Sequence, residues 1–224
     1  AGSLATPGAP VHLNFPFREP FLPADGEVAN ASAVAEFSGT RSAGPPSIQM
    51  SSGSLLDRRL DLTKLAESMS PARHGLIVVG PQPDSAAGMS IRKLAAAAGF
   101  PILADPLSQV RHGPDHGACV VDRYDAFLRD DATAGALTPD VIYRLGATPT
   151  SKPLLQYLRR HAAARQVLVQ WGSWNDPLLV ATHAVEASPG GFAEALLSAF
   201  GTLADGDKTL VARREWAARW RRLN

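Results

Sequence analysis

The chain has 224 residues, 45% of them hydrophobic, which is enough for one full-sized domain with flanking segments. Its 22 Lys and Arg residues nearly balance its 21 Asp and Glu residues. The formal net charge of +1 gives no reason to expect a nucleic acid or an acidic membrane as partner. No apolar run approaches the roughly 20 residues that cross a bilayer.

Cysteine content and the first residues indicate the compartment. Cys119 is the single cysteine, which excludes an internal disulfide and fits a reducing environment. The first residues lack the basic segment and apolar core of a secretion signal. We therefore expect a cytoplasmic protein.

The N-terminal segment contains a strand and a linker. Residues 11–15 alternate apolar and polar side chains, the pattern of a strand with one apolar face. Prolines at 16, 20 and 23 then hold the chain extended. A lone strand cannot bury its apolar face, so we expect a neighbour to cover it. Residues 24–54 are rich in Ala, Ser, Gly and Pro and are interpreted as an exposed linker.

Beyond the linker, short apolar runs alternate with helical patterns. The glycine-bounded run 75–80 is typical of a central parallel strand buried on both faces. Further strands are predicted at 101–105, 141–146, 166–170 and 181–187. Helices are predicted at 60–66, 85–99, 124–129, 151–161, 191–200 and 208–222, with Gly99 as a C-terminal cap. This alternation predicts an α/β fold, a Rossmann-like, doubly wound, mostly parallel sheet with helices on both faces.

The turn at 80–88 is where dinucleotide-binding folds carry their glycine fingerprint. Pro81 and Pro83 occupy this turn, and no Gly-x-Gly-x-x-Gly pattern or Walker-type phosphate loop is present. Ser85 is a candidate cap of the next helix that would present free N–H groups to an anion. A plain loop and cap is favoured over a nucleotide site.

Several residues are of types that bind metals or act in catalysis, but their spacing along the chain matches no known motif. His112, Asp115, His116 and Cys119 resemble zinc ligands in a row, but the spacing matches no common zinc pattern, so no metal site is predicted. No nucleophile elbow occurs.

The candidate acids Asp105, Asp125 and Asp176 are scattered rather than paired. Asp105 follows a predicted strand, where open α/β sheets place ligand-facing groups. A cap of the following turn is the favoured role for it.

The segment 146–156 is the best candidate site, because it leaves a strand at its carboxyl end and enters a helix. Thr148, Thr150 and Ser151 are expected to converge there, with Thr150 or Ser151 as the cap. Lys152 in the first turn opposes the helix dipole unless an anion lies nearby. The loop therefore suits a carboxylate or a phosphate, and a solvated lysine is an equally good interpretation.

The closing helix is rich in arginine and carries Trp216 and Trp220 four residues apart. The two rings should share one face with Val211 or Ala212. An amphipathic helix that packs on the sheet or on a neighbouring domain is favoured over a nucleic-acid surface.

Seven blocks of the chain resemble, in the same order, the MenD family of thiamine-diphosphate-dependent synthases of menaquinone biosynthesis. They include Gly99-Phe-Pro-Ile-Leu-Ala-Asp-Pro-Leu-Ser-Gln-Val-Arg111 and Pro149-Thr-Ser-Lys152. The others lie at 10–23, 74–80, 123–129, 137–146 and 174–177.

The resemblance implies a part of a three-domain transferase that joins 2-oxoglutarate and isochorismate with decarboxylation. Residues 1–23 would be the tail of the pyrimidine-binding domain, 24–54 the linker, and 55–224 the central domain. The partners would be the pyrimidine- and pyrophosphate-binding domains, in a dimer or tetramer of the full-length protein. Thiamine diphosphate and Mg²⁺ would bind those other domains, so no catalytic, cofactor-binding or metal-binding residue is expected in this chain.

The resemblance also implies a substrate-binding set made of Arg111, Thr150, Ser151 and Lys152. Lys152 matches a basic residue that faces the active site and binds a substrate carboxylate. Pro153 stands where some members have a second basic residue, and Arg111 is expected to reach the same cleft. Two alternatives stay open: a regulatory domain that binds an anion or aromatic acid, and a nucleotide-binding Rossmann domain.

Overall fold

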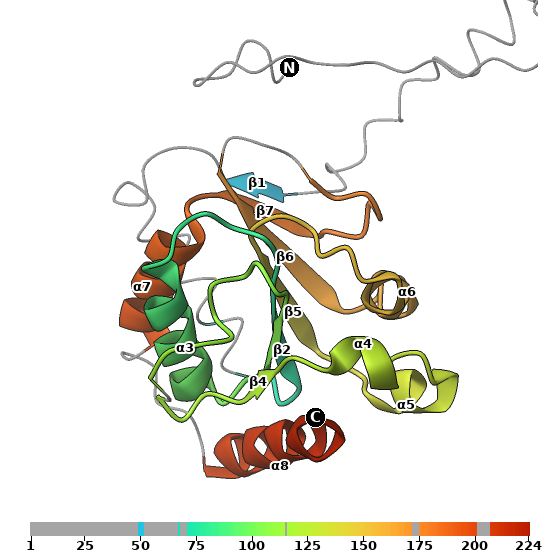
Figure 1. Ribbon diagram of the computed structural model, residues 1–224. Helices are drawn as coiled ribbons and strands as arrows, with labels where there is room; N and C mark the ends of the chain where they lie inside the picture. The colour runs from blue at the N-terminus through green and yellow to red at the C-terminus, as the bar shows by residue number, and fades with distance from the viewer. Residues whose placement is uncertain (1–48, 52–66, 68–70, 115, 172–174, 201–206) are drawn as a thin grey trace, which may run out of the picture. The chain divides into compact units, whose positions relative to one another are not determined.

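A computed structural model describes residues 49–51, 67, 71–114, 116–171, 175–200 and 207–224. They belong to one unit, Ile48–Asn224. The sheet has seven parallel strands in the order β1-β7-β6-β5-β2-β3-β4 (Figure 1). Their bounds are β1 Gln49–Ser51, β2 Gly75–Val79, β3 Ile102–Ala104, β4 Val120–Val121, β5 Val141–Leu145, β6 Arg165–Gln170 and β7 His183–Glu186.

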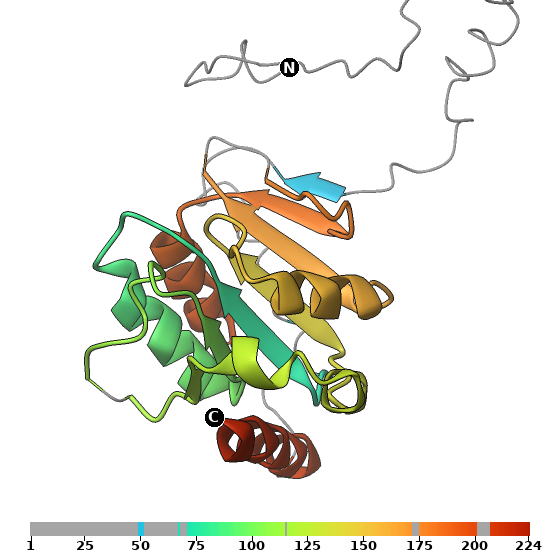
Figure 2. The same ribbon diagram turned by 45° about the vertical axis from the view of Figure 1, so that its right-hand side comes forward.

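Helices cover both faces of this sheet, as the two views in Figures 1 and 2 show. One face packs against α3 (Ala87–Ala98) and α7 (Pro189–Phe200). The other packs against α4 (Tyr124–Phe127), α5 (Asp131–Ala136), α6 (Lys152–Arg160) and α8 (Asp207–Leu223). The predicted doubly wound α/β fold is therefore confirmed.

The central strand β2 shows why this sequence forms a two-sided sheet. All five of its residues are buried. Ile77 and Val79 join the core under α3 and α7, whereas Leu76 and Val78 join the core under α6 and α8. A strand buried on both faces needs a continuous apolar run, and this run predicts the strand correctly.

Helix α3 confirms one predicted end and corrects the other. Gly99 caps its C-terminus in the left-handed conformation, with φ 68°, and its N–H group bonds back to the last turn. Ser85 does not cap the N-terminus. Oδ1 of Asp84 accepts hydrogen bonds from the backbone N–H groups of Ala86 (2.9 Å) and Ala87 (3.3 Å) instead.

Three short elements are absent from the sequence-based prediction. Residues 49–51, inside the predicted linker 24–54, form β1 and pair with residues 183–185 of β7. Strand β4 and helix α5 were not predicted either. The predicted strand at 11–15 and helix at 60–66 lie outside the described residues, so the domain boundaries stay predictions.

Helix α8 packs on the sheet through its two tryptophans, as its amphipathic pattern predicts. Trp216 and Trp220 are 1% and 0% exposed, and their rings meet edge-on at 5.7 Å. Nε1 of Trp216 donates a hydrogen bond to the Gly75 carbonyl oxygen at 2.8 Å. Val211 is 54% exposed, so it does not share this face. No helix among the described residues is long and apolar enough to cross a membrane.

We expect Trp216→Ala to lower the free energy of unfolding by about 3–5 kcal/mol, because it empties a buried site and removes the hydrogen bond to Gly75. Val211→Ala on the exposed side of the same helix should change it by less than about 0.5 kcal/mol. Urea unfolding of both variants checks this. Similar losses in the two variants would contradict the role given to the Trp216 face.

Candidate functional site

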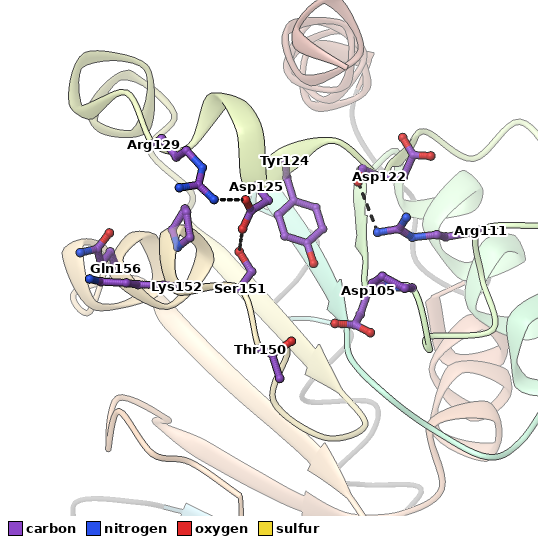
Figure 3. Close-up of a pocket in the computed structure, with 12 residues that line it drawn as sticks. Asp105, Arg111, Asp122, Tyr124, Asp125, Arg129, Thr150, Ser151, Lys152 and Gln156 are labelled. Atoms are coloured by element: carbon purple, nitrogen blue, oxygen red, sulfur yellow. Dashed lines mark hydrogen bonds and ion pairs between the residues drawn. The ribbon is translucent and has the colours of Figure 1, made fainter.

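A pocket of about 730 Å³ lies at the carboxyl ends of β3, β4 and β5 (Figure 3). Three segments line it: residues 105–111 after β3, residues 122–129 after β4, and residues 150–156 at the start of α6. Open α/β sheets bind ligands beyond the carboxyl ends of their strands. We call this site the carboxyl-end pocket.

All four residues of the predicted substrate-binding set line this pocket: Arg111, Thr150, Ser151 and Lys152. Figure 3 shows Lys152 beside Gln156 and well apart from Arg111, with Tyr124 between them. The two predicted cations thus line one cavity but belong to different ends of it.

Ser151, rather than Thr150, caps helix α6. Its backbone is extended, and its Oγ accepts a hydrogen bond from the Leu154 N–H group at 3.2 Å. Lys152 follows in the first turn, where its side chain is exposed. No described residue forms an ion pair or a hydrogen bond with the Lys152 ammonium group.

Asp125 ties helix α4 to the start of α6. Its Oδ1 accepts a hydrogen bond from Ser151 Oγ at 2.6 Å, and its Oδ2 pairs with Arg129 Nη2 at 2.6 Å. The Ser151 hydroxyl first, and the Arg129 guanidinium second, lower the pKa of the Asp125 carboxyl below its ordinary value. Asp125 therefore holds the cap of α6 and neutralises one of the cations of the pocket.

Arg111 is held by backbone carbonyl groups rather than by an acid. Its Nε donates to the Ala104 oxygen at 3.0 Å, and its Nη2 donates to the Asp122 oxygen at 3.3 Å. Ala104 is the last residue of β3, and Asp122 directly follows the neighbouring strand β4. The guanidinium therefore fixes the relative position of two lining segments.

Asp105 and Tyr124 form the buried wall of the pocket. Oδ1 of Asp105 accepts a hydrogen bond from the Leu107 N–H group at 2.9 Å, so the predicted turn cap is correct. The same residue also lines the pocket, and its ligand-facing role stays a prediction. Burial first, and the Asp105 charge second, raise the pKa of Tyr124 to about 12, although the Arg111 charge acts in the opposite direction.

Sequence reasoning assigned no role to Tyr124, Arg129 or Gln156, all of which line the pocket. The first two lie in the block 123–129, one of the blocks that carries the family resemblance. The resemblance of that block was the sequence feature that could have pointed to Tyr124 and Arg129. Their position in a pocket depends on how α4 lies against α6, which no local pattern encodes.

A buried ion pair supports the loop that leads to the pocket. Arg144 Nη1 and Asp176 Oδ1 lie 2.7 Å apart with both side chains almost fully buried. Oδ2 of Asp176 accepts a hydrogen bond from the Ala181 N–H group at 2.9 Å. The Thr148 hydroxyl donates to the Asn175 carbonyl oxygen at 2.9 Å. Thr148 is thus a support of the loop and not a pocket residue, contrary to the sequence-based expectation.

The turn that would bind a pyrophosphate is filled by the chain itself. The N–H group of Gly80 donates to the Leu145 oxygen at 2.9 Å, and that of Ala147 donates to the Pro81 oxygen at 3.0 Å. A Cβ atom added at Gly80 would lie 1.6 Å from the Ala147 oxygen, so only glycine allows this approach. The interlocked turns occupy the switch point between β2 and β5, which opposes nucleotide binding there.

The row of possible metal ligands forms no metal centre in the part of the chain that the structure describes. No group of three or more His, Cys, Asp or Glu side chains is suitably placed among the described residues. Asp115 lies outside them. Cys119 is buried next to β4, and burial raises the pKa of its thiol.

Residues 62–198 match the family model described as the middle domain of thiamine pyrophosphate. The chain belongs to this family of thiamine pyrophosphate enzyme middle domains. The match covers more than half of the chain and confirms the resemblance inferred from the sequence blocks.

Two curated relatives are named 2-succinyl-5-enolpyruvyl-6-hydroxy-3-cyclohexene-1-carboxylate synthase. That of Geobacillus kaustophilus is 39% identical over 218 residues, covering 97% of this chain and 35% of the relative. That of Chloroflexus aurantiacus is 38% identical over 210 residues, covering 93% of this chain and 34% of the relative. The chain thus spans about a third of the length of these relatives.

A solved structure described as a putative thiamin diphosphate-dependent enzyme isolated from Mycobacterium smegmatis also matches. It has a TM-score of 0.38 and 18% identity, and the match covers 66% of this chain and 28% of that chain. The fold described here rests on the strand order and on the helices that cover both faces of the sheet.

We expect Arg144→Ala to lower the free energy of unfolding by about 3–5 kcal/mol, because it leaves the Asp176 carboxylate buried without its partner. The control is Arg160→Ala, which breaks the exposed pair of Arg160 with Asp131 and should cost less than about 1 kcal/mol. Denaturant unfolding of both variants checks the difference. Equal costs would mean that burial does not set the strength of the Arg144 pair.

The lowered pKa of Asp125 gives a pH-dependent contribution to stability. Because the folded-state pKa lies below the ordinary value of about 3.9, the contribution is fully present above that value and is lost as the pH falls through the folded-state pKa. Asp125→Asn should therefore cost at most about 1 kcal/mol at pH 7, since the pair is partly exposed.

The free energy difference between wild type and Asp125→Asn should narrow below about pH 4. Urea unfolding at pH 7, 5 and 3.5 measures it. Asp122→Asn removes another carboxylate of the same pocket and is the matched control. If the free energy difference between wild type and Asp125→Asn stays constant across this range, or grows as the pH falls, the lowered pKa of Asp125 does not contribute to stability.

Proposed function

We propose that this chain is the central domain of a thiamine-diphosphate-dependent synthase that joins 2-oxoglutarate and isochorismate with decarboxylation. Its own contribution is to bind a substrate carboxylate at the Lys152 end of the carboxyl-end pocket. The family membership and the names of the two relatives support the type of enzyme. The remaining two thirds of the length of those relatives would supply the catalytic domains.

The observation that carries the binding proposal is the unpaired ammonium group of Lys152. It lies at the N-terminus of α6, where the helix dipole repels a cation and attracts an anion. Ser151 caps this helix and is fixed by Asp125, so the first turn has a defined position. A carboxylate bound there would meet both the Lys152 charge and the positive end of the dipole.

The cofactor belongs to the other domains in this proposal. Thiamine diphosphate needs a phosphate-binding turn and a metal, and the described residues offer neither a free turn at the switch point nor a group of metal ligands. The pyrimidine- and pyrophosphate-binding domains would hold thiamine diphosphate and Mg²⁺. The full-length protein would act as a cytoplasmic dimer or tetramer.

We expect Lys152→Ala in the full-length enzyme to raise KM for the substrate whose carboxylate it binds by roughly ten- to a hundredfold. This is the loss of a charge-assisted contact worth about 1.5–3 kcal/mol. Lys93→Ala on α3, which removes an exposed lysine on the opposite face, should leave KM unchanged. Steady-state kinetics with each substrate varied in turn makes the measurement.

Unchanged KM values for both substrates in Lys152→Ala would overturn the proposed role of Lys152. The same experiment tests the regulatory alternative. In the regulatory alternative, an aromatic acid inhibits the wild-type enzyme but not Lys152→Ala. The KM values for the two substrates are then the same in Lys152→Ala as in the wild type, and the pocket is a regulatory site.

A further inference from the structure

A side chain from the end of helix α8 covers the outer edge of strand β4. This strand is the last in the sheet order, so one of its edges has no neighbouring strand among the described residues. Oδ1 of Asn224, the residue after α8, accepts hydrogen bonds from the N–H groups of Asp122 (3.0 Å) and Arg123 (2.9 Å). Its Nδ2 lies 3.5 Å from the Val120 carbonyl oxygen, which makes a long and weak bond. The Asn224 amide therefore binds backbone groups that a neighbouring strand would otherwise bind.

The same amide supports the start of helix α4, which begins at Tyr124. The residue before this helix, Arg123, forms no side-chain cap hydrogen bond of its own. In a capping box, a side chain three residues further along accepts a hydrogen bond from the N–H group of this N-cap residue. Here the acceptor is Asn224, 101 residues away in the sequence. The start of α4 is thus fixed by tertiary structure.

Helix α4 connects this point to the Lys152 end of the carboxyl-end pocket. Asp125 lies in its first turn and lines the pocket. Its Oδ1 accepts a hydrogen bond from Ser151 Oγ at 2.6 Å, and Ser151 caps α6 (Figure 3). Lys152 is the next residue. A displacement of the start of α4 would therefore move Asp125 and, through the Ser151 hydroxyl, the first turn of α6.

The backbone of Asp122 is held by side chains at both of its polar groups. Arg111 Nη2 donates to its carbonyl oxygen at 3.3 Å, and Asn224 accepts from its N–H group. Arg111 lines the pocket, whereas Asn224 is not among the lining residues. Any effect of Asn224 on a bound ligand must therefore pass through the backbone that it holds.

We propose that Asn224 is a positioning residue for the carboxyl-end pocket. By holding the N–H groups of Asp122 and Arg123, it fixes the backbone from which Asp125 places the first turn of α6. The effect on a substrate rests on the proposed function, in which Lys152 binds a substrate carboxylate. Loss of Asn224 misplaces this contact and leaves the reacting groups in the other domains unchanged, so binding weakens and the chemical step does not.

The test is steady-state kinetics of the full-length enzyme. Asn224→Ala should raise KM for the substrate that Lys152 binds by about three- to tenfold, as expected for a lost cap, and leave kcat within about twofold. Asn224→Asp keeps an oxygen acceptor for both N–H groups, so its KM should stay within about twofold of the wild-type value. Arg222→Ala, an exposed residue of the same turn, is the matched control and should change neither constant. Circular dichroism and the Tm of each variant show whether it is folded.

A double variant shows whether Asn224 and Lys152 act through one contact. In a Lys152→Ala background, Asn224→Ala should raise KM by less than about twofold further, because the contact that it misplaces is already absent. The inference is overturned if Asn224→Ala leaves KM unchanged, or if Asn224→Asp raises KM as much as Asn224→Ala does. It is also overturned if Lys152→Ala raises KM and the double variant multiplies the two increases.

Amide hydrogen exchange of the full-length protein separates this inference from the proposed function. Asn224→Ala should speed exchange in residues 122–129 and 151–156, and Asn224→Asp should not. If both segments exchange faster and KM rises in Asn224→Ala, but Lys152→Ala has no effect on KM, the positioning role stands and the Lys152 role fails. Unchanged exchange in residues 151–156 of a folded Asn224→Ala variant contradicts the inference.

If Asn224→Ala does not fold, Asn224→Ser replaces it. The Ser hydroxyl lies closer to the backbone of α8 than Asn224 Oδ1 does, so it does not reach both N–H groups. Asn224→Ser should therefore raise KM and speed exchange in the same two segments. Wild-type values of both quantities in folded Asn224→Ser would refute the positioning role.

Discussion

A parallel sheet is stable in water when both of its faces are covered, and this constraint organises the described part of the chain. Leu76 and Ile77, adjacent in β2, belong to different cores on opposite faces. Helices therefore cover both faces of the sheet, and loops connect the ends of its strands. Since all strands run in one direction, their carboxyl ends meet at one edge, where the pocket forms.

Short polar links then fix the loops at that edge. Asp125 joins α4 to α6 through Ser151, and Arg144 joins β5 to the segment after β6 through Asp176. These links use the acids and hydroxyls that sequence reasoning found scattered. Among the described residues of the pocket, these links leave the Lys152 ammonium group without an ion pair or hydrogen bond.

Sequence patterns predicted most of the fold because the main strands are continuous apolar runs and the helices have clear ends. Gly99 ends α3 where a left-handed residue is needed, and Ser151 caps α6. Strands β1 and β4 have three and two residues, too short for any period to be recognised. Asp84 and Ser85 are both good helix caps, and only the path of the turn decided between them.

By itself the sequence determined the α/β alternation, the cation at the start of α6 and the turn role of Asp105, because each depends on neighbours along the chain. The tertiary structure alone decided which of these side chains meet. Asp125 and Ser151 are 26 residues apart, and Arg144 and Asp176 are 32 apart. A hydrogen bond depends on distance in space, and strand order sets that distance only after the sheet has assembled.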